Sequence, residues 1–157
     1  MIYAALTAAL YVVLTYISSM LGLASGPVQL RISEALTILP IFIPQSVYGL
    51  FAGCIISNLL TGSAVWDIIF GSLATLIAAL VTRKFKNNPL IAFASPVLFN
   101  VLIVPPVIYL VYPSEQTLIL TYIGVFIGQA VSVFAFGGML FGALRKINLF
   151  NGEKNDR

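Results

Sequence analysis

The sequence predicts an all-α polytopic membrane protein, built as a transmembrane bundle of six helices. Hydrophobic residues make up 60% of its 157 positions and charged residues 8%, against about 25% charged in typical globular domains. Charge-free tracts follow one another along the chain, at residues 1–30, 35–66, 68–82, 87–114 and 116–144. Because a spanning helix needs roughly 20 mostly apolar residues, we expect lipid to surround most of this chain.

The pattern of these tracts also limits what the chain can do. They are solidly apolar rather than alternating between apolar and polar residues, which favours helices over a transmembrane barrel. The sequence has no histidine and one cysteine, Cys54, and it contains no P-loop motif for ATP. We therefore expect a protein that is not an enzyme and that holds no metal or cofactor. The net charge of +3 comes from basic residues at membrane edges and does not indicate nucleic acid binding.

Four long helices follow directly from the tracts and their breaks. They are expected at residues 2–24, 65–82, 89–112 and 116–144. The first ends at a Ser-Gly-Pro break at 25–27, and the last two are joined by a turn at 112–115. One transmembrane domain is therefore expected over residues 1–150, followed by a polar cytoplasmic tail at 151–157.

The stretch between the first two of these helices, residues 34–62, is too long for one crossing. A continuous helix of this length would measure about 43 Å, whereas the hydrocarbon core is about 30 Å thick. Pro40 and Pro44 interrupt the stretch, because proline disfavours helix at the residue before it. We expect a short second helix and a full-length third helix, and either five or six crossings in total.

Basic clusters at two helix ends orient the bundle. Residues 83–86 read Arg-Lys-Phe-Lys, and Arg145 and Lys146 follow the last helix. Lys and Arg beside membrane spans favour the cytoplasm, so the turn at 112–115 is expected outside. Six crossings would place the N-terminus in the cytoplasm and five would place it outside. The N-terminus has no Lys or Arg that decides between them.

A few polar side chains stand out in this apolar chain. An ionisable residue at the centre of a membrane helix costs about 2.5–3.5 kcal/mol on the insertion scale, so it tends to face a partner or a substrate path. Arg31 and Glu34 lie three residues apart in the motif RISEAL, and Asp67 follows Trp66. With six crossings these residues share one outer depth with Asn58. With five, Arg31 and Glu34 fall on the opposite side.

Each of these residues also has a structural explanation. Arg31 and Glu34 can pair on one helix face. Ser33 and Asp67 are candidate N-caps, which would place Glu34 in a first turn that favours a carboxylate. Uncharged polar residues inside the spans default to interhelical hydrogen bonds, and these are Asn58, Asn100 and Gln129. The last two fall at mid-membrane and are candidates for the floor of a pocket.

Small residues recur at four-residue spacing, which lets helices approach closely. The pairs are Ala4 and Ala8, Ala5 and Ala9, Gly49 and Gly53, Gly124 and Gly128, and Gly138 and Gly142. Internal packing explains most such pairs. The first helix, however, presents a nearly featureless alanine face that suits docking to a partner membrane protein.

Three stretches resemble the QueT transporter family: VQLRISEALTILPIFIP (28–44), GLFAGCIISNLL (49–60) and WDIIFGSLATLIAALVTRK (66–84). Members of this family are substrate-binding S-components of energy-coupling factor (ECF) transporters, proposed to import queuosine precursors. The second half of the chain matches mainly in length and in its Pro-flanked helices. The resemblance implies six helices in the plasma membrane, with both termini cytoplasmic and a pocket that opens outward.

The same resemblance implies partners and a cargo. The partners are a transmembrane coupling subunit and two ATPase subunits, with the coupling subunit docked on Ala4, Ala5, Ala8 and Ala9. The cargo is queuine or a precursor, a 7-deazaguanine base that in some cases carries a cationic aminomethyl group. A carboxylate can accept the paired N–H donors of such a base. The candidate substrate-binding residues are Arg31, Glu34, Asn58, Trp66, Asp67 and Asn100.

Three other interpretations stay open at this level. The same fold could carry another small cargo such as a vitamin. The chain could be a membrane scaffold whose charges only hold helices together, or a solitary carrier driven by an ion gradient.

Overall fold

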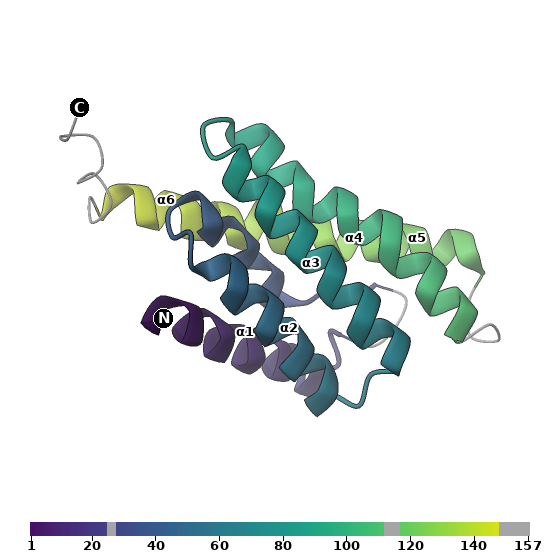
Figure 1. Cartoon of the computed structure of the whole chain (residues 1–157). Coiled ribbons are helices and arrows are strands. Elements are labelled where there is room, and N and C mark those ends of the chain that lie inside the picture. The colour runs from purple at the N-terminus through teal and green to yellow at the C-terminus, as the bar shows by residue number, and fades with distance from the viewer. Residues whose placement is uncertain (25–27, 112–116, 148–157) are drawn as a thin grey trace.

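A computed structural model describes residues 1–24, 28–111 and 117–147, and this part of the chain is helical with short connections. The elements in chain order are α1 (Ile2–Met20), η1 (Ile32–Ile41), α2 (Ser46–Leu60), α3 (Val65–Lys84), α4 (Pro89–Val111), α5 (Leu118–Ala130), η2 (Val131–Gly137) and α6 (Gly138–Lys146). The last three run on as one span (Leu118–Lys146). Figure 1 shows the elements packed side by side as a bundle, which confirms the predicted fold class.

Within the described residues, four helices are long and apolar enough to cross a membrane: α1, α3, α4 and the Leu118–Lys146 span. They correspond to the four long helices predicted from the tracts, although α1 ends at Met20 rather than at residue 24. The predicted breaks at 25–27 and 112–115 and the tail at 151–157 lie outside the described residues.

The predicted break near Pro40 and Pro44 is confirmed, but the two elements beside it differ from expectation. The short second element, η1, is a 3₁₀ helix rather than an α-helix. The helix after the break, α2, has 15 residues and so measures roughly 22 Å, less than the full-length helix expected. Both elements are too short to cover the hydrocarbon core by themselves.

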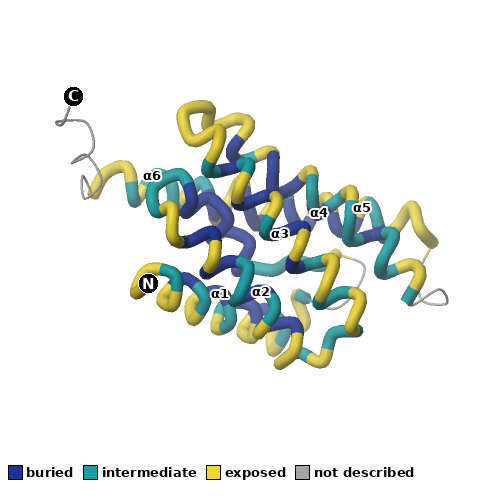
Figure 2. Tube along the Cα trace, in the orientation of Figure 1, coloured by how far each residue is buried: buried dark blue, intermediate teal, exposed yellow. Residues whose placement is uncertain are grey.

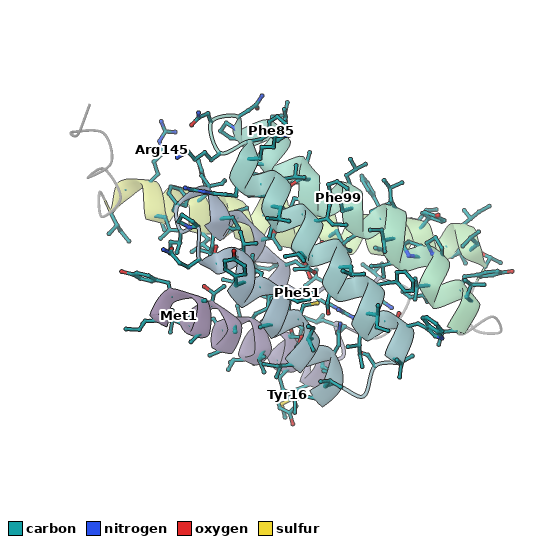
Figure 3. The ribbon with its side chains drawn as sticks, viewed as in Figure 1. Met1, Tyr16, Phe51, Phe85, Phe99 and Arg145 are labelled. Atoms are coloured by element: carbon teal, nitrogen blue, oxygen red, sulfur yellow. The ribbon has the colours of Figure 1, made fainter. Side chains whose placement is uncertain are left out.

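Successive elements alternate in direction, as a six-helix bundle requires. Met1, Phe85 and Arg145 all lie toward the same end of the molecule (Figure 3), and we call this the basic end because Arg83, Lys84, Arg145 and Lys146 cluster there. The last turns of α1 and α2 and the first turn of α3 lie at the opposite end (Figure 1), which we call the far end.

Two of the far-end helix termini have the same backbone design. Gly22 follows α1 and Gly62 follows α2, with φ of 70° and 71°, a left-handed conformation that glycine adopts without steric cost. The Gly62 N–H donates to the Leu59 carbonyl and the next N–H donates to the Asn58 carbonyl. This is the Schellman arrangement, which satisfies the last carbonyls of a helix. It ends α2 one turn after Asn58.

η1 is the central element of the bundle. Every residue from Ser33 to Pro40 is buried, and η1 packs against α1, α2, α3, α4, α6 and η2. Figure 2 shows the buried trace running through the middle of the molecule. A helix surrounded on all sides should be apolar all round, and residues 35–40 read Ala-Leu-Thr-Ile-Leu-Pro. The Thr37 hydroxyl donates to the Glu34 carbonyl at 2.6 Å, so it has a partner within the element.

The outer surfaces of the long helices are covered by large apolar side chains. They include Leu6, Leu10, Leu80, Leu98, Leu102 and Leu110. Tyr16 lies on the outside of α1 near its far end (Figure 3) and is half exposed. In water this surface would drive aggregation, whereas in a bilayer it faces solvent of matching polarity.

Candidate functional site

An apolar contact between three elements divides the interior of the bundle. Ile38 of η1, Val97 of α4 and Val133 of η2 form one buried cluster, with Phe42, Phe93 and Phe141 packed beside it. The Phe93 and Phe141 rings lie edge to face with centroids 5.5 Å apart. We call this cluster the apolar floor, because it separates the basic end from the polar groups described next.

One helical turn from the apolar floor toward the far end, each of the three elements carries polar side chains. On η1, Glu34 lies four residues before Ile38, and on α4, Asn100 lies three residues after Val97. On the long last span, Gln129 lies four residues before Val133, and Ser132 directly precedes Val133. Glu34, Asn100, Gln129 and Ser132 are all buried. Glu34, Asn100 and Gln129 each lie about one turn beyond the apolar floor along their own elements, and Ser132 lies beside Val133 at the edge of the floor. We call these four buried residues the polar layer.

Glu34 is the charged residue of this layer. It is only 2% exposed. The Tyr11 hydroxyl donates to its Oε1 atom at 2.5 Å, whereas Oε2 has no hydrogen-bond partner in the described part of the chain. A buried carboxylate oxygen without a donor is unfavourable, and such groups in membrane proteins mark functional positions.

Three further oxygens share this condition. Among the described residues, the buried side-chain oxygens without a hydrogen-bond partner are Glu34 Oε2, Ser72 Oγ, Gln129 Oε1 and Ser132 Oγ. Most buried polar groups in folded proteins are paired. Three of the four belong to the polar layer, so the layer has acceptor capacity that the protein itself leaves unused.

A second polar cluster lies at the far end. The Arg31 Nη1 atom donates to Asn58 Oδ1 at 3.2 Å, and the Asn58 amide nitrogen lies 3.6 Å from the Cys54 sulfur. The positive charge of Arg31 also acts on the carboxyl groups of both Glu34 and Asp67. Arg31 therefore links the polar layer to the far-end surface.

Hydrogen bonds from α1 hold the start of η1 in place. The Thr15 hydroxyl donates to Ser33 Oγ at 2.7 Å, and the Ile32 N–H donates to Ser18 Oγ at 3.0 Å. The prediction that Ser33 caps a helix is wrong, because η1 begins at Ile32 with Arg31 at the N-cap position. Glu34 does lie in the first turn of η1, as expected.

The predicted pairing of Arg31 with Glu34 is replaced by separate partners. Arg31 bonds to Asn58 and Glu34 bonds to Tyr11. Arg31 precedes η1 in an extended conformation, so the two side chains do not follow the spacing of one helix face. The predicted cap at Asp67 is also wrong, since the N-cap of α3 is Ala64.

The remaining candidates differ in exposure. Trp66 is 58% exposed and stacks on Phe70 with ring centroids 6.0 Å apart, so it lies on the surface rather than inside the polar layer. Asp67 is half-buried in the first turn of α3. The Asn100 amide nitrogen donates to the Pro96 carbonyl at 2.9 Å within α4.

The four alanines of α1 divide into two pairs. A Cβ on Gly49 would meet the Ala4 carbonyl, and one on Gly53 would lie 3.1 Å from the Ala8 Cα atom. Ala4 and Ala8 therefore serve the close packing of α1 against α2. Ala5 and Ala9 are exposed.

Sequence reasoning missed the residues whose importance comes from their partners. Tyr11 and Thr15 are a turn apart on α1 and look like ordinary helix residues, yet they bond to η1. Ser132 and Ser72 carry no motif. The one available signal was periodicity, since Thr7, Tyr11, Thr15 and Ser18 recur on a single face of a mostly apolar helix.

The fold and the site together define a class of protein. Long apolar helices surround a central buried element, and that element carries a buried carboxylate with one oxygen that has no partner among the described residues. Within residues 1–24, 28–111 and 117–147, no group of three or more His, Cys, Asp or Glu side chains could hold a metal ion. These features are those of a helical membrane protein with polar groups buried inside the bundle.

Comparison with known proteins identifies the family. The family model described as QueT transporter matches residues 1–146, and the chain belongs to this family. It is 30% identical over 155 residues to the queuosine precursor transporter QueT of Lactococcus lactis subsp. cremoris (strain MG1363), an alignment that covers 90% of this chain and 89% of that protein. No solved structure matches the chain. The chain is therefore a membrane transport protein, as the sequence motifs predicted.

Proposed function

We propose that this chain is the substrate-binding subunit, the S-component, of an ECF-type ATP-driven importer, and that it captures a queuosine precursor or queuine from outside the cell. The observation that carries the proposal is Glu34, a buried carboxylate whose Oε2 atom lacks a donor. Membership of the QueT transporter family supports a queuosine precursor as the cargo.

The chemistry of the cargo suits this carboxylate. A 7-deazaguanine base presents two N–H donors side by side on its guanine-like edge, and a carboxylate can accept both in a charge-assisted pair of hydrogen bonds. The Tyr11 hydroxyl holds the Glu34 carboxylate through Oε1, and each carboxylate oxygen has capacity for more than one donor. Tyr11 is therefore a positioning residue and Glu34 the contact to the base.

The other candidates take supporting roles. Asn100 lies in the polar layer and contacts the edge of the base beside Glu34. Arg31, fixed by Asn58, and the half-buried Asp67 form the entrance at the far end. Trp66, which stacks on Phe70 at the surface, covers this entrance from the membrane side.

The direction of transport follows from the charge distribution. The basic end holds Arg83, Lys84, Arg145 and Lys146, and Lys and Arg beside membrane spans favour the cytoplasm. The termini are then cytoplasmic and the far end, with Arg31 and Asp67, faces outside in the plasma membrane. The cargo enters from outside and is stopped by the apolar floor.

Energy for uptake comes from partner subunits. The sequence has no P-loop motif of its own, so ATP hydrolysis belongs to two ATPases coupled through a transmembrane subunit. The exposed Ala5 and Ala9 offer a smooth helix face on which such a subunit packs closely.

Binding to the purified protein tests the cargo. We expect queuine and 7-deazaguanine bases to bind the wild-type chain in detergent or nanodiscs, as measured by calorimetry. Glu34→Gln should weaken binding by at least about tenfold, since a hydrogen bond to a charged group contributes about 1.5–3 kcal/mol. Asp67→Asn should have a smaller effect because its carboxylate is only half-buried. Binding of a vitamin in place of these bases, or unchanged binding after Glu34→Gln, would contradict the proposal.

Co-purification tests the partners. Ala5→Leu and Ala9→Leu should reduce recovery of the coupling subunit without changing cargo binding. Ala94→Leu is the matched control, because Ala94 is also an exposed alanine but lies on α4. Uptake into vesicles that contain this chain alone would favour the solitary carrier instead.

A further inference from the structure

One face of the long last span lies directly against η1. A Cβ placed on Gly128 would meet the Gln29 carbonyl oxygen, and one placed on Gly137 would lie 3.4 Å from the Ala35 carbonyl oxygen. Gly128 therefore marks where the span touches the segment just before η1, and Gly137 marks where it touches η1 itself.

The spacing along the span places Ser132 on the same face. An α-helix returns to one face after four residues and a π-helix after five. Gly128, Ser132 and Gly137 follow this 4-then-5 spacing, and the π-helical segment η2 (Val131–Gly137) supplies the longer step. Ser132 thus faces η1 between Gln29 and Ala35. It is fully buried, and its Oγ atom has no partner among the described residues.

Gln129 completes this side of the polar layer. It is 6% exposed, and its Oε1 atom also lacks a donor within the described ranges. An amide oxygen can only accept hydrogen bonds, whereas a serine hydroxyl can accept and donate. A group that fills both needs must therefore carry hydrogen-bond donors.

The protein backbone gives a second indication. π-helical segments are rare and occur mostly as single turns, frequently at functional sites. Here the segment begins two residues after Gln129 and includes Ser132. Without the extra residue of the π turn, Gly128 and Gly137 could not both face η1 with Ser132 between them.

We propose that Gln129 and Ser132 form a second subsite, which accepts hydrogen bonds from the substituent on the five-membered ring of the base. This inference rests on the proposed function, in which Glu34 holds the paired N–H edge. The substituent lies on the other ring, away from that edge. The subsite makes the chain selective for a base whose substituent donates hydrogen bonds, such as aminomethyl, over a base with a nitrile, which only accepts.

The selectivity can be measured with three probes that differ only in the substituent. They are 7-aminomethyl-7-deazaguanine, 7-cyano-7-deazaguanine and unsubstituted 7-deazaguanine. We expect the wild-type chain to bind the aminomethyl base at least about tenfold more tightly than the cyano base. The double variant Gln129→Leu with Ser132→Ala should lose this preference while its affinity for the unsubstituted base changes by less than about threefold.

Two further variants separate recognition from packing. Gln129→Glu keeps the shape of the side chain and adds a negative charge, so it should widen the preference for the cationic aminomethyl base over the cyano base. Ser95→Ala is the matched control for loss of a buried hydroxyl, because Ser95 bonds to Thr82 and to the Ala78 carbonyl away from the polar layer. It should leave the ratio between the three bases unchanged.

The outcomes distinguish this inference from the proposed function. Equal weakening of all three bases by the double variant, or loss of selectivity in Asp67→Asn instead, would overturn the second subsite. If Glu34→Gln weakens every base while the double variant changes no ratio, the second subsite is wrong and the proposed function stands. If the wild-type chain binds none of the bases, both are wrong.

Discussion

Two packing interfaces in this bundle, which we call seams, bring backbones close together, and both depend on glycines that leave room for the neighbouring segment. In the first, α1 packs on α2, where Gly49 faces Ala4 and Gly53 faces Ala8. In the second, the span from α5 through η2 packs on η1 and the residues just before it, where Gly128 faces Gln29 and Gly137 faces Ala35. The first seam joins two regular α-helices, whereas the second joins a 3₁₀ segment and a π segment.

The two seams also differ in their polar groups. Along the first, the α1 hydroxyls have partners: Thr7 donates to the Tyr3 carbonyl and Thr15 donates to the Tyr11 carbonyl as well as to Ser33. Along the second, Ser132 and Gln129 keep unpartnered oxygens. The first seam, which has close packing alone, therefore indicates a structural role. The second seam combines close packing with irregular backbone and unpartnered polar atoms, and this combination indicates a binding site.

The largest effect is expected at the first seam. Gly49→Leu would drive a side chain into the Ala4 backbone, so we expect the free energy of unfolding to fall by about 3 kcal/mol or more, at the upper end of overpacking effects. Thermal unfolding in detergent measures this. Gly142→Leu is the control, because nothing lies within 4 Å of a Cβ at Gly142. Equal destabilisation by both variants would remove the distinction between a packed and an unpacked glycine.

A smaller loss of stability but a larger loss of binding is expected at the second seam. Gly128→Ala forces the segment at Gln29 to move, which also displaces Arg31 two residues later. We expect a destabilisation of about 1–3 kcal/mol, together with at least about tenfold weaker cargo binding. Binding that is unchanged at this level of destabilisation would show that the second seam is structural, like the first.

Substitution of the two partners in the Tyr11–Glu34 hydrogen bond should affect different properties, stability for Tyr11 and cargo binding for Glu34. Tyr11→Phe removes the donor to Glu34 and leaves the carboxylate buried without it, so stability should fall by about 1–3 kcal/mol. Glu34→Gln removes the charge and should change stability by less than about 1 kcal/mol, while it weakens binding. Unfolding curves of the two variants without cargo provide the comparison. A Glu34→Gln variant much less stable than Tyr11→Phe would make Glu34 a structural residue.

The smallest effect is expected where α1 holds η1. Thr15→Val removes the hydrogen bond to Ser33, and interhelical hydrogen bonds in membranes contribute about 0.6 kcal/mol on average. Thr7→Val is the control, since the Thr7 hydroxyl bonds only one turn back along α1. The difference in unfolding temperature between the two variants isolates the contact to η1, and no difference would mean that Ser33 is held by packing.

Much of the fold could be predicted from local signals. Charge-free tracts set the long helices, and Pro40 with Pro44 marked the break after the short second element. The basic clusters at 83–86 and 145–146 correctly indicated that these two helix ends lie at the same end of the bundle. The 3₁₀ geometry of η1 and the π turn of η2 could not be predicted, because neither segment has a residue pattern that distinguishes it from an ordinary α-helix.

The candidate site was predicted in part. The motif RISEAL and the far-end residues Asn58 and Asp67 stood out because charge is costly in an apolar chain. Their partners did not, since the hydroxyl that holds Glu34 comes from 23 residues earlier and the amide that holds Arg31 comes from 27 residues later. The opposite side of the polar layer was anticipated only through Asn100 and Gln129 as mid-membrane polar residues.

By itself the sequence determined that this protein is embedded in lipid, which stretches form its long helices, and which few side chains are too polar to be there without a reason. These are local properties, because apolar length, proline and charge act over one or two turns. Only the tertiary structure decided which polar atoms are satisfied within the protein and which are left for a ligand. That depends on side chains brought together from distant helices, and no single stretch of the chain contains it.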